Sequence, residues 1–272
     1  MPRKKKKSLL WRATKATARG IGKGAVGIGK GIAATYRFSK KKINESKEKK
    51  KIESSPVYKA QSKYVKPGVH KVITGNPEDL EERFNKDSII ALIFGKRGSG
   101  KSALGFKIME NINFKSKRSS CVLGINENIP KWVKPITDVE QAPSGAIVLV
   151  DEGAIAFGSR ESMSSKNREL SKLLAIARHK NLTILFITQN TGLIDKNVLK
   201  LVDTLLVKEG SLLQMEMERS EIKKFYEKAH NNLKGLPGTI KQYVYIIDSD
   251  FEGVLSFPLP SFWSESLSKN QS

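Results

Sequence analysis

The chain has 272 residues, and its 49 Lys and Arg against 27 Asp and Glu give a formal net charge of +22. This length is enough for one sizeable core plus an extension. The single cysteine, Cys121, excludes an internal disulfide, and we expect it to be a small buried apolar residue. The three histidines are scattered along the sequence and suggest no metal site. No stretch reaches the roughly 18 apolar residues of a membrane span, and the apolar part after Lys4–Lys7 is too short for a secretory signal. We therefore expect an intracellular soluble protein.

The positive charge is concentrated near the N-terminus. Residues 1–51 hold 18 Lys and Arg and 2 Glu, a net of +16, whereas residues 52–272 hold 31 and 25, a net of +6. In the Gly-rich arm over 1–38, Ile-Gly-Lys-Gly occurs at 21–24 and again at 28–31. Glycine disfavours an isolated helix there, although an anionic surface can induce one. Three interpretations stay open: a disordered arm that neutralises nucleic-acid phosphates, a membrane-surface anchor, or a solvated tail.

Residues 39–75 are expected to form a polar linker, because lysine runs and Ser-Pro and Pro-Gly pairs interrupt any periodic pattern. The globular domain is expected over 76–272. Asn76 is placed to cap a first helix, which Leu80 and Phe84 would dock on the core.

From residue 88 the chain alternates strand and helix signals, which is typical of a mostly parallel sheet buried on both faces, an α/β fold. An irregular segment is expected between 126 and 144. The expected strands are Ile89–Phe94, Cys121–Ile125, Ala146–Val150, Leu182–Thr188 and Thr204–Val207, followed by a C-terminal β-hairpin of Ile240–Ile247 and Gly253–Phe257 across Asp248–Glu252. The expected helices are Lys101–Asn111, about 165–179, a short one near Lys196–Leu201 and one opened by Ser220.

The first of these strands leads into a glycine-rich loop. Eight residues fit G-x-x-x-x-G-K-[ST], the phosphate-binding P-loop. Its glycines let backbone N–H groups turn toward an anion at the start of a helix, where the helix dipole also favours negative charge. The lysine would bind the β- and γ-phosphates of ATP, and the serine hydroxyl can ligate Mg²⁺. The alternative is a chance glycine turn. The loop residues are Gly95, Lys96, Arg97, Gly98, Ser99, Gly100, Lys101 and Ser102.

Two acids follow the strand Ala146–Val150. On a buried parallel strand, Asp151 would emerge at the carboxyl end of the sheet beside the loop and could hold Mg²⁺. Glu152 would then orient and polarise the attacking water as general base. The alternative is two solvated acids after a strand.

The strand Leu182–Thr188 also ends in polar residues at the same expected edge. A glutamine there, Gln189, can hydrogen-bond the γ-phosphate or the water and so report hydrolysis. The alternative is a residue that only caps the strand.

A P-loop, an Asp-Glu pair and a polar residue after a further strand suggest the additional-strand-catalytic-glutamate class of NTPases. The stretch Leu174–Asn190, in which a helix ending in Arg178 leads into a strand ending in Thr-Gln, resembles the FtsK–HerA superfamily of DNA-pumping ATPases. Gly192–Asp195 continues the resemblance. Within that superfamily the chain is similar to viral genome-packaging ATPases and to zonular occludens toxin (Zot)-like ATPases. The resemblance covers roughly 88 to 210 and implies the sheet order 5-1-4-3-2 for the five strands in chain order.

The resemblance also implies a ring, a hexamer, with ATP at subunit interfaces and double-stranded DNA through the pore. Arg178 and Arg160 are candidates for an arginine finger. The basic loop Gly158–Arg168 is a candidate DNA-contacting pore loop, or else a solvated surface loop. The membrane span of many Zot-like phage proteins is missing, which favours a motor in the cytoplasm, the host's if the chain is viral. Contact with a capsid or an anionic membrane through the N-terminal arm stays open.

These features together predict a Mg²⁺-dependent ATPase that moves double-stranded DNA, for viral or mobile-element genome packaging. Two alternatives remain: a membrane-associated Zot-like ATPase for virion assembly or export without DNA translocation, and a nucleotide-gated binding protein that hydrolyses slowly. No base-reading motif distinguishes ATP from GTP.

Overall fold

A computed structural model describes residues 52–126, 128–151, 163–189 and 199–264, with only the backbone described at 163–169, 212 and 214. The chain divides into two compact units, residues 1–55 and 56–272, and the second contains the fold described below. The predicted disordered arm over 1–38 lies outside the described residues. Within the part of the chain that is described, no helix has the length and apolar character needed to cross a membrane.

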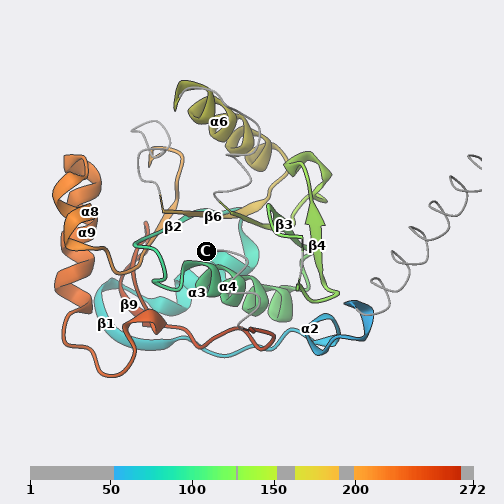
Figure 1. Cartoon of the computed structure of the whole chain (residues 1–272), viewed down its shortest axis with the longest axis horizontal. Coiled ribbons are helices and arrows are strands. Elements are labelled where there is room, and N and C mark those ends of the chain that lie inside the picture. The colour runs from blue at the N-terminus through green and yellow to red at the C-terminus, as the bar shows by residue number, and fades with distance from the viewer. Residues whose placement is uncertain (1–51, 127, 152–162, 190–198, 265–272) are drawn as a thin grey trace, which may run out of the picture. The chain divides into compact units, whose positions relative to one another are not determined.

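The second unit alternates strands and helices along most of its length (Figure 1). The strands are β1 (Gly68–Gly75), β2 (Ile90–Phe94), β3 (Ser120–Leu123), β4 (Val133–Ile136), β5 (Ile147–Val150), β6 (Thr183–Thr188), β7 (Thr204–Val207), β8 (Tyr243–Ile247) and β9 (Phe251–Ser256). The helices are α2 (Pro56–Lys59), α3 (Pro77–Lys86), α4 (Lys101–Ser116), α6 (Met163–His179), α8 (Leu212–Met217) and α9 (Ser220–Leu233), with short 3₁₀ turns η1 (Val139–Gln141) and η3 (Ile240–Gln242).

The described strands form one nine-stranded sheet in the order β1-β9-β8-β7-β2-β6-β5-β3-β4. From β7 to β4 every neighbouring pair is parallel, and β8, β9 and β1 add antiparallel strands at one side. The predicted α/β fold is confirmed. The order β7-β2-β6-β5-β3 is the predicted 5-1-4-3-2, and β8 and β9 are the predicted C-terminal hairpin.

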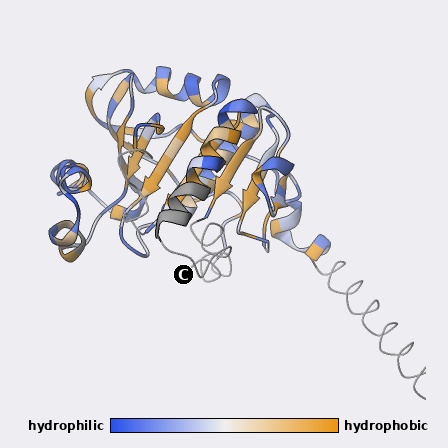
Figure 2. Cartoon of the chain, turned by 90° about the horizontal axis from the view of Figure 1, so that it is seen from above, coloured by the Kyte–Doolittle hydropathy of each residue, from blue (hydrophilic) through white to orange (hydrophobic). Residues whose placement is uncertain are grey.

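Helices cover both faces of the sheet, with α6 and α9 on one and α3 and α4 on the other (Figure 1). The central strands β2, β5 and β6 are buried along their whole length, and they are apolar except for the threonines at the two ends of β6, since both faces of the sheet are covered (Figure 2). Alternate residues of β2 therefore belong to different cores: Leu92 packs on the α6 and α9 side, and Ile93 on the α4 side.

The helix α4 is buried on all sides over its first three turns, from Lys101 to Ile112. It lies very close to the sheet at Gly105, where a Cβ would stand 2.6 Å from Leu149 Cδ1, 3.2 Å from Ile187 Cδ1 and 3.4 Å from Ile93 Cδ1. Glycine at this position lets the helix approach β2, β5 and β6 at once.

The outer face of α4 is covered by two chain segments far apart in sequence. Val65 exchanges two hydrogen bonds with the side chain of Asn111, 3.2 and 2.8 Å long. The buried carboxylate of Glu110 accepts bonds from the Lys63 N–H and the Ser261 N–H, each 3.2 Å long. These contacts explain why polar side chains of α4 are buried.

The structure differs from the sequence expectations at two places. The edge strand β1 and the short helix α2 lie within residues 39–75, where only a polar linker is expected. The strand β4 and the turn η1 lie within 126–144, where an irregular chain is expected; that expectation is wrong. The predicted cap is present, since the Asn76 side chain accepts a hydrogen bond from the Glu78 N–H at 3.1 Å. Most of the short helix expected near Lys196–Leu201 lies outside the described residues.

Candidate phosphate-binding site

The loop Gly95–Ser102 connects the central strand β2 to α4. Its three glycines have positive φ angles of 151° at Gly95, 71° at Gly98 and 89° at Gly100. At Gly98 a Cβ would meet nothing within 4 Å, so the backbone angle alone favours glycine there. At Gly95 a Cβ would also lie 2.7 Å from Lys208 Cβ, so the packing requires glycine as well.

The side chain of Lys101 is held by the loop's own carbonyl groups. Its Nζ donates to the carbonyl oxygens of Gly95, at 3.0 Å, and Lys96, at 2.9 Å, and the residue is 6% exposed. This arrangement places a positive charge at the N-terminal end of α4. A helix N-terminus and a lysine together attract an anion.

The loop also contains a buried hydroxyl group without a partner. Ser99 is 2% exposed, and within the described structure its Oγ makes no hydrogen bond. Leaving a buried polar atom unsatisfied costs about 1–3 kcal/mol, and a phosphate oxygen would satisfy this one. The donors present at the loop therefore fit a phosphate group.

Asp151 directly follows the buried strand β5. Its N–H donates to the Leu123 carbonyl at 3.1 Å, and its side chain is half-buried. One strand, β6, separates β5 from β2, so Asp151 and the loop share one edge of the sheet about 10 Å apart. One carboxylate and a serine hydroxyl suit Mg²⁺, which usually keeps several waters and phosphate ligands. Within the described residues there is no group of three or more His, Cys, Asp or Glu that could hold a metal ion.

Gln189 follows β6, the strand between the loop and Asp151. In the parallel pairing of β2 and β6, Phe94 is the partner of Thr188, so Gly95 and Gln189 follow their strands at the same level. Thr188 is fully buried and Gln189 is exposed. The sheet thus brings the ends of three strands, carrying the loop, Gln189 and Asp151, to one edge.

A family model described as zonular occludens toxin (Zot) matches residues 105–249, which is more than half of the chain. The chain belongs to the Zot family. This match confirms the predicted resemblance to Zot-like ATPases within the FtsK–HerA superfamily. It begins just after the loop and includes Asp151 and Gln189. A search of curated proteins finds no match to this Zot-family chain.

Several solved structures are similar to the Zot-family chain at low sequence identity. The DNA-packaging ATPase B204 of Sulfolobus turreted icosahedral virus is 14% identical over 64% of this chain and 98% of its own, with a TM-score of 0.44. EssC (ATPases 2 and 3) of Geobacillus thermodenitrificans is 10% identical over 79% of this chain and 49% of its own, with a TM-score of 0.42. The conjugation coupling protein TcpA of pCW3 is 12% identical over 80% of this chain and 75% of its own, with a TM-score of 0.45.

Some of the predicted site residues lie outside the described part of the Zot-family chain. Glu152, the predicted general base, and Arg160 belong to the segment 152–162. The predicted pore loop over 158–168 falls there and in the part of α6 whose side chains are not described. Their roles stay predictions.

Arg178 is described, and it lies at the other edge of the sheet. It is near the end of α6, just before β6 begins, and its Nη2 donates to the Leu201 carbonyl at 3.3 Å. The six residues of β6 separate this edge from Gln189 by about 20 Å. Arg178 is therefore not at the loop of its own chain, and a finger role would require the loop of another subunit.

Two residues at the loop were missed by the sequence reasoning. Glu209 accepts a hydrogen bond from the Lys96 N–H through its carbonyl, at 2.9 Å, and its carboxylate pairs with Lys96 Nζ at 2.7 Å. The second residue, Lys208, is buried against Gly95 and Gly100. Both follow β7, the strand beside β2. The predicted strand order already places the carboxyl end of β7 next to the loop. The two residues that follow β7 could therefore have been identified from the sequence as neighbours of the loop.

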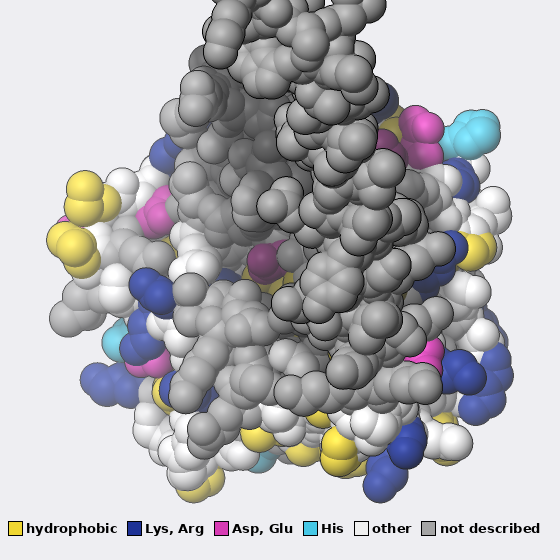
Figure 3. All heavy atoms as spheres, turned by 45° about the vertical axis from the view of Figure 1, so that its right-hand side comes forward, with side chains coloured by type: hydrophobic (Ala, Val, Ile, Leu, Met, Phe, Trp, Pro, Cys, Tyr) yellow, Lys and Arg dark blue, Asp and Glu magenta, His cyan; other side chains and the backbone are white. Residues whose placement is uncertain are grey.

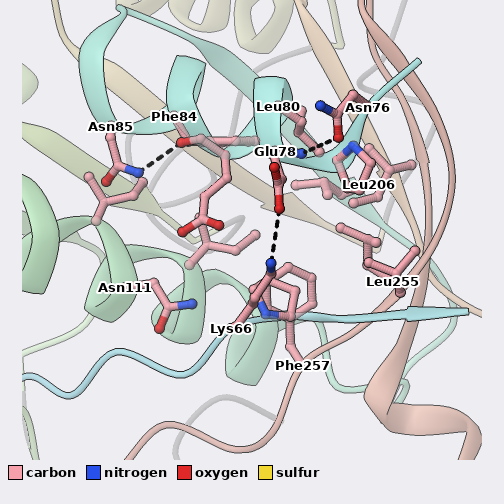
Figure 4. Close-up of a pocket in the computed structure, with 17 residues that line it drawn as sticks. Lys66, Asn76, Glu78, Leu80, Phe84, Asn85, Asn111, Leu206, Leu255 and Phe257 are labelled. Atoms are coloured by element: carbon pink, nitrogen blue, oxygen red, sulfur yellow. Dashed lines mark hydrogen bonds and ion pairs between the residues drawn. The ribbon is translucent and has the colours of Figure 1, made fainter.

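A separate apolar cavity of about 120 Å³ lies between α3, α4 and the sheet (Figure 4). Lys66 and Glu78 form a 3.0 Å ion pair at its lining. Its other lining residues include Leu80, Phe84 and Leu255, and none belongs to the loop Gly95–Ser102. This cavity is not the phosphate site.

Proposed function

We propose that the chain is a Mg²⁺-dependent ATPase that moves double-stranded DNA, for packaging of a viral or mobile-element genome. The observation that carries the proposal is the loop after β2, where Lys101 and the unpartnered Ser99 hydroxyl meet the N-terminus of α4. This set of donors is suited to a polyphosphate. Membership of the Zot family supports an ATPase.

Each polar group at this edge takes one role in the proposed hydrolysis. Lys101 binds the β- and γ-phosphates, and Ser102 and Asp151 hold the magnesium ion. Bound Mg²⁺ supplies neutralisation of the phosphate charge. Glu152 accepts a proton from the attacking water, which makes that water a better nucleophile. Gln189 hydrogen-bonds the water or the γ-phosphate and so distinguishes the triphosphate from the diphosphate.

The charge distribution supports DNA as the partner. Residues 1–51 carry a net charge of +16, and residues 52–272 only +6. On the face shown in Figure 3, the coloured Lys and Arg side chains lie at several separate places. The N-terminal arm is therefore the strongest candidate for a contact with DNA phosphates. In this proposal the chain works as a ring, a hexamer, in the cytoplasm of the host cell.

The test is the ATPase rate of the full chain with and without duplex DNA. We expect DNA to stimulate hydrolysis in the wild type, and Glu152→Gln to lower kcat by about 100-fold or more, because the general base is lost. Glu140→Gln, which removes an exposed carboxylate from η1, is the matched control and should hydrolyse at the wild-type rate. A Glu152→Gln variant as active as the wild type would refute the assigned mechanism.

The family match favours one second candidate, a membrane-associated ATPase for virion assembly or export without DNA translocation. Here the basic arm would bind an anionic membrane. Flotation with anionic liposomes, with and without residues 1–38, distinguishes the two functions. This candidate would be favoured if the protein floats with the liposomes only when residues 1–38 are present and if its ATPase rate is the same with and without duplex DNA.

A further inference from the structure

Lys208 is a buried lysine outside the P-loop motif. It follows the last residue of β7, the strand paired with β2, and is 1% exposed. An ammonium group buried to this extent is strongly unfavourable unless hydrogen bonds compensate it. Its position next to the phosphate loop therefore calls for an explanation.

The ammonium group of Lys208 is bound to the beginning of β8. Its Nζ donates to the carbonyl oxygens of Lys241, at 2.6 Å, and Tyr243, at 2.5 Å. Lys241 belongs to η3 and Tyr243 is the first residue of β8. One charged side chain thus connects the end of β7 to the start of β8.

The phosphate loop packs directly on this connection. A Cβ at Gly95 would lie 2.7 Å from Lys208 Cβ, and a Cβ at Gly100 would lie 3.1 Å from the Lys241 carbonyl oxygen and 3.9 Å from Lys208 Cε. The Lys96 N–H donates to the Glu209 carbonyl at 2.9 Å. The two outer glycines of the motif are therefore needed for the loop to lie against Lys208 and its partners.

The surroundings of Lys208, its burial first of all, lower the pKa of its ammonium group in the protein without nucleotide. Burial, and after it the positive charge of Lys101, lower the pKa of Lys208 to about 7, and the Glu209 carboxylate acts in the opposite direction. That carboxylate is itself paired with Lys96. The groups that η3 and β8 are seen to present to Lys208 are the two carbonyl oxygens.

We propose that Lys208 is a positioning residue of the phosphate site, which fixes the loop against the start of β8 and adds positive charge behind a bound triphosphate. This inference rests on the proposed function, since it requires a nucleotide at the loop. Lys208 does not need to touch the phosphates, because its two bonds hold the backbone that presents the loop. Its positive charge lies behind the loop and attracts the bound triphosphate without contacting it.

The proposal predicts the sign of a pH dependence. A bound triphosphate favours the charged form of Lys208, so its pKa rises on binding and the protein takes up protons at and above neutral pH. The part of the affinity that Lys208 supplies is then complete below about pH 7 and declines as the pH rises above that value. A residue with only a packing role would produce no such decline.

The experiment is calorimetric titration of the full chain with Mg²⁺ and a non-hydrolysable ATP analogue, at pH 7.5, in two buffers of different ionisation enthalpy. We expect Lys208→Met to weaken binding about tenfold and to lower the proton uptake measured in the wild type. Lys180→Met is the matched control. It removes an equal charge at the opposite sheet edge, where Lys180 Nζ donates to the Glu140 carbonyl, and should leave both quantities unchanged.

A second variant, Lys208→Arg, covers the case in which the methionine variant does not fold. Its guanidinium stays charged at every pH used, so we expect it to bind the analogue without the proton uptake that Lys208 provides. Wild-type affinity and wild-type proton uptake in either variant would overturn the role of Lys208. A wild-type chain that binds no analogue would overturn the proposed function as well.

Discussion

At the scale of single residues, the buried hydroxyl of Ser99 would, under the proposed function, affect both the stability of the protein and its affinity for nucleotide. Its Oγ is buried without a hydrogen-bond partner in the described structure, as is the Oγ of Ser120 at the start of β3. Ser120 belongs to the sheet edge opposite the loop. Both serine hydroxyls therefore lack a hydrogen bond, but only Ser99 lies where a bound phosphate would provide one.

For Ser99→Ala we expect the protein without nucleotide to gain up to about 1 kcal/mol of unfolding free energy, because an unsatisfied buried hydroxyl is removed. Nucleotide affinity should fall by about fivefold to tenfold at the same time, because a donor to phosphate is lost. Urea denaturation measures the first effect and analogue titration the second. Ser120→Ala is the matched control, expected to gain stability with unchanged affinity. Equal affinity in both variants would exclude Ser99 from the site.

The residues of the loop could be predicted from the sequence, and its supporting residues could not. The glycines, Lys101 and Ser102 lie within one continuous stretch of sequence, so a sequence motif identifies them. Lys208 and Glu209 are about a hundred positions away and reach the loop only because β7 pairs with β2. A buried lysine also contradicts the general expectation that lysine is exposed.

At the scale of elements, α4 depends on the segments that cover it. Glu110 is fully buried and pairs with Lys107 Nζ at 2.7 Å, besides accepting from Lys63 and Ser261. Both partners of this ion pair lie on α4 itself. The carboxylate thus holds two distant chain segments on the helix that begins at the phosphate loop.

For Glu110→Ala we expect a loss of about 3 kcal/mol in unfolding free energy, since the Lys107 ammonium is left buried without its carboxylate. Denaturation in urea measures the loss. Glu82→Ala, which breaks the exposed pair of Glu82 with Lys86 on α3, is the control and should leave the midpoint unchanged. An unchanged midpoint in Glu110→Ala would contradict the role assigned to these contacts.

Among the described strands, the two that the sequence did not predict are β1 and β4, at the two edges of the sheet. All but the first residue of β1 are exposed, and it pairs only with β9 through an irregular register, so its side chains show no apolar alternation. The strand β4 contains Pro135, which disfavours a strand unless the strand is at an edge. The central strands were predicted because burial on both faces makes them continuously apolar.

At the scale of the whole molecule, most of the net positive charge, +16 of +22, belongs to residues 1–51. The order of the central strands was predicted, since buried strands and their helices follow one another regularly along the chain and the family resemblance supplied the pairing order. The partner of residues 1–51 does not follow from the same rules, because polybasic segments bind any polyanion.

We expect deletion of residues 1–51 to weaken duplex DNA binding and to make it less dependent on salt. The slope of log affinity against log salt should change by roughly 0.9 for each DNA phosphate that the arm neutralises in the full chain. Fluorescence anisotropy over a range of salt concentrations measures this slope, and hydrolysis without DNA should stay at the wild-type rate. If the affinity for duplex DNA changes neither with salt concentration nor with the deletion, the arm does not bind DNA.

The close contact of α4 with the sheet has a consequence for the proposed nucleotide site. Gly105 is in the second turn of the helix, one turn beyond Lys101, and its missing methyl group lets the helix lie close to Leu149 and Ile187. Those two side chains belong to the strands that end at Asp151 and Gln189. Under the proposed function, glycine at position 105 therefore helps to set the distance between Lys101 and Asp151 that a bound nucleotide would span. A larger residue at position 105 would push α4 away from the sheet and so move Lys101 away from Asp151, although it would contact neither residue.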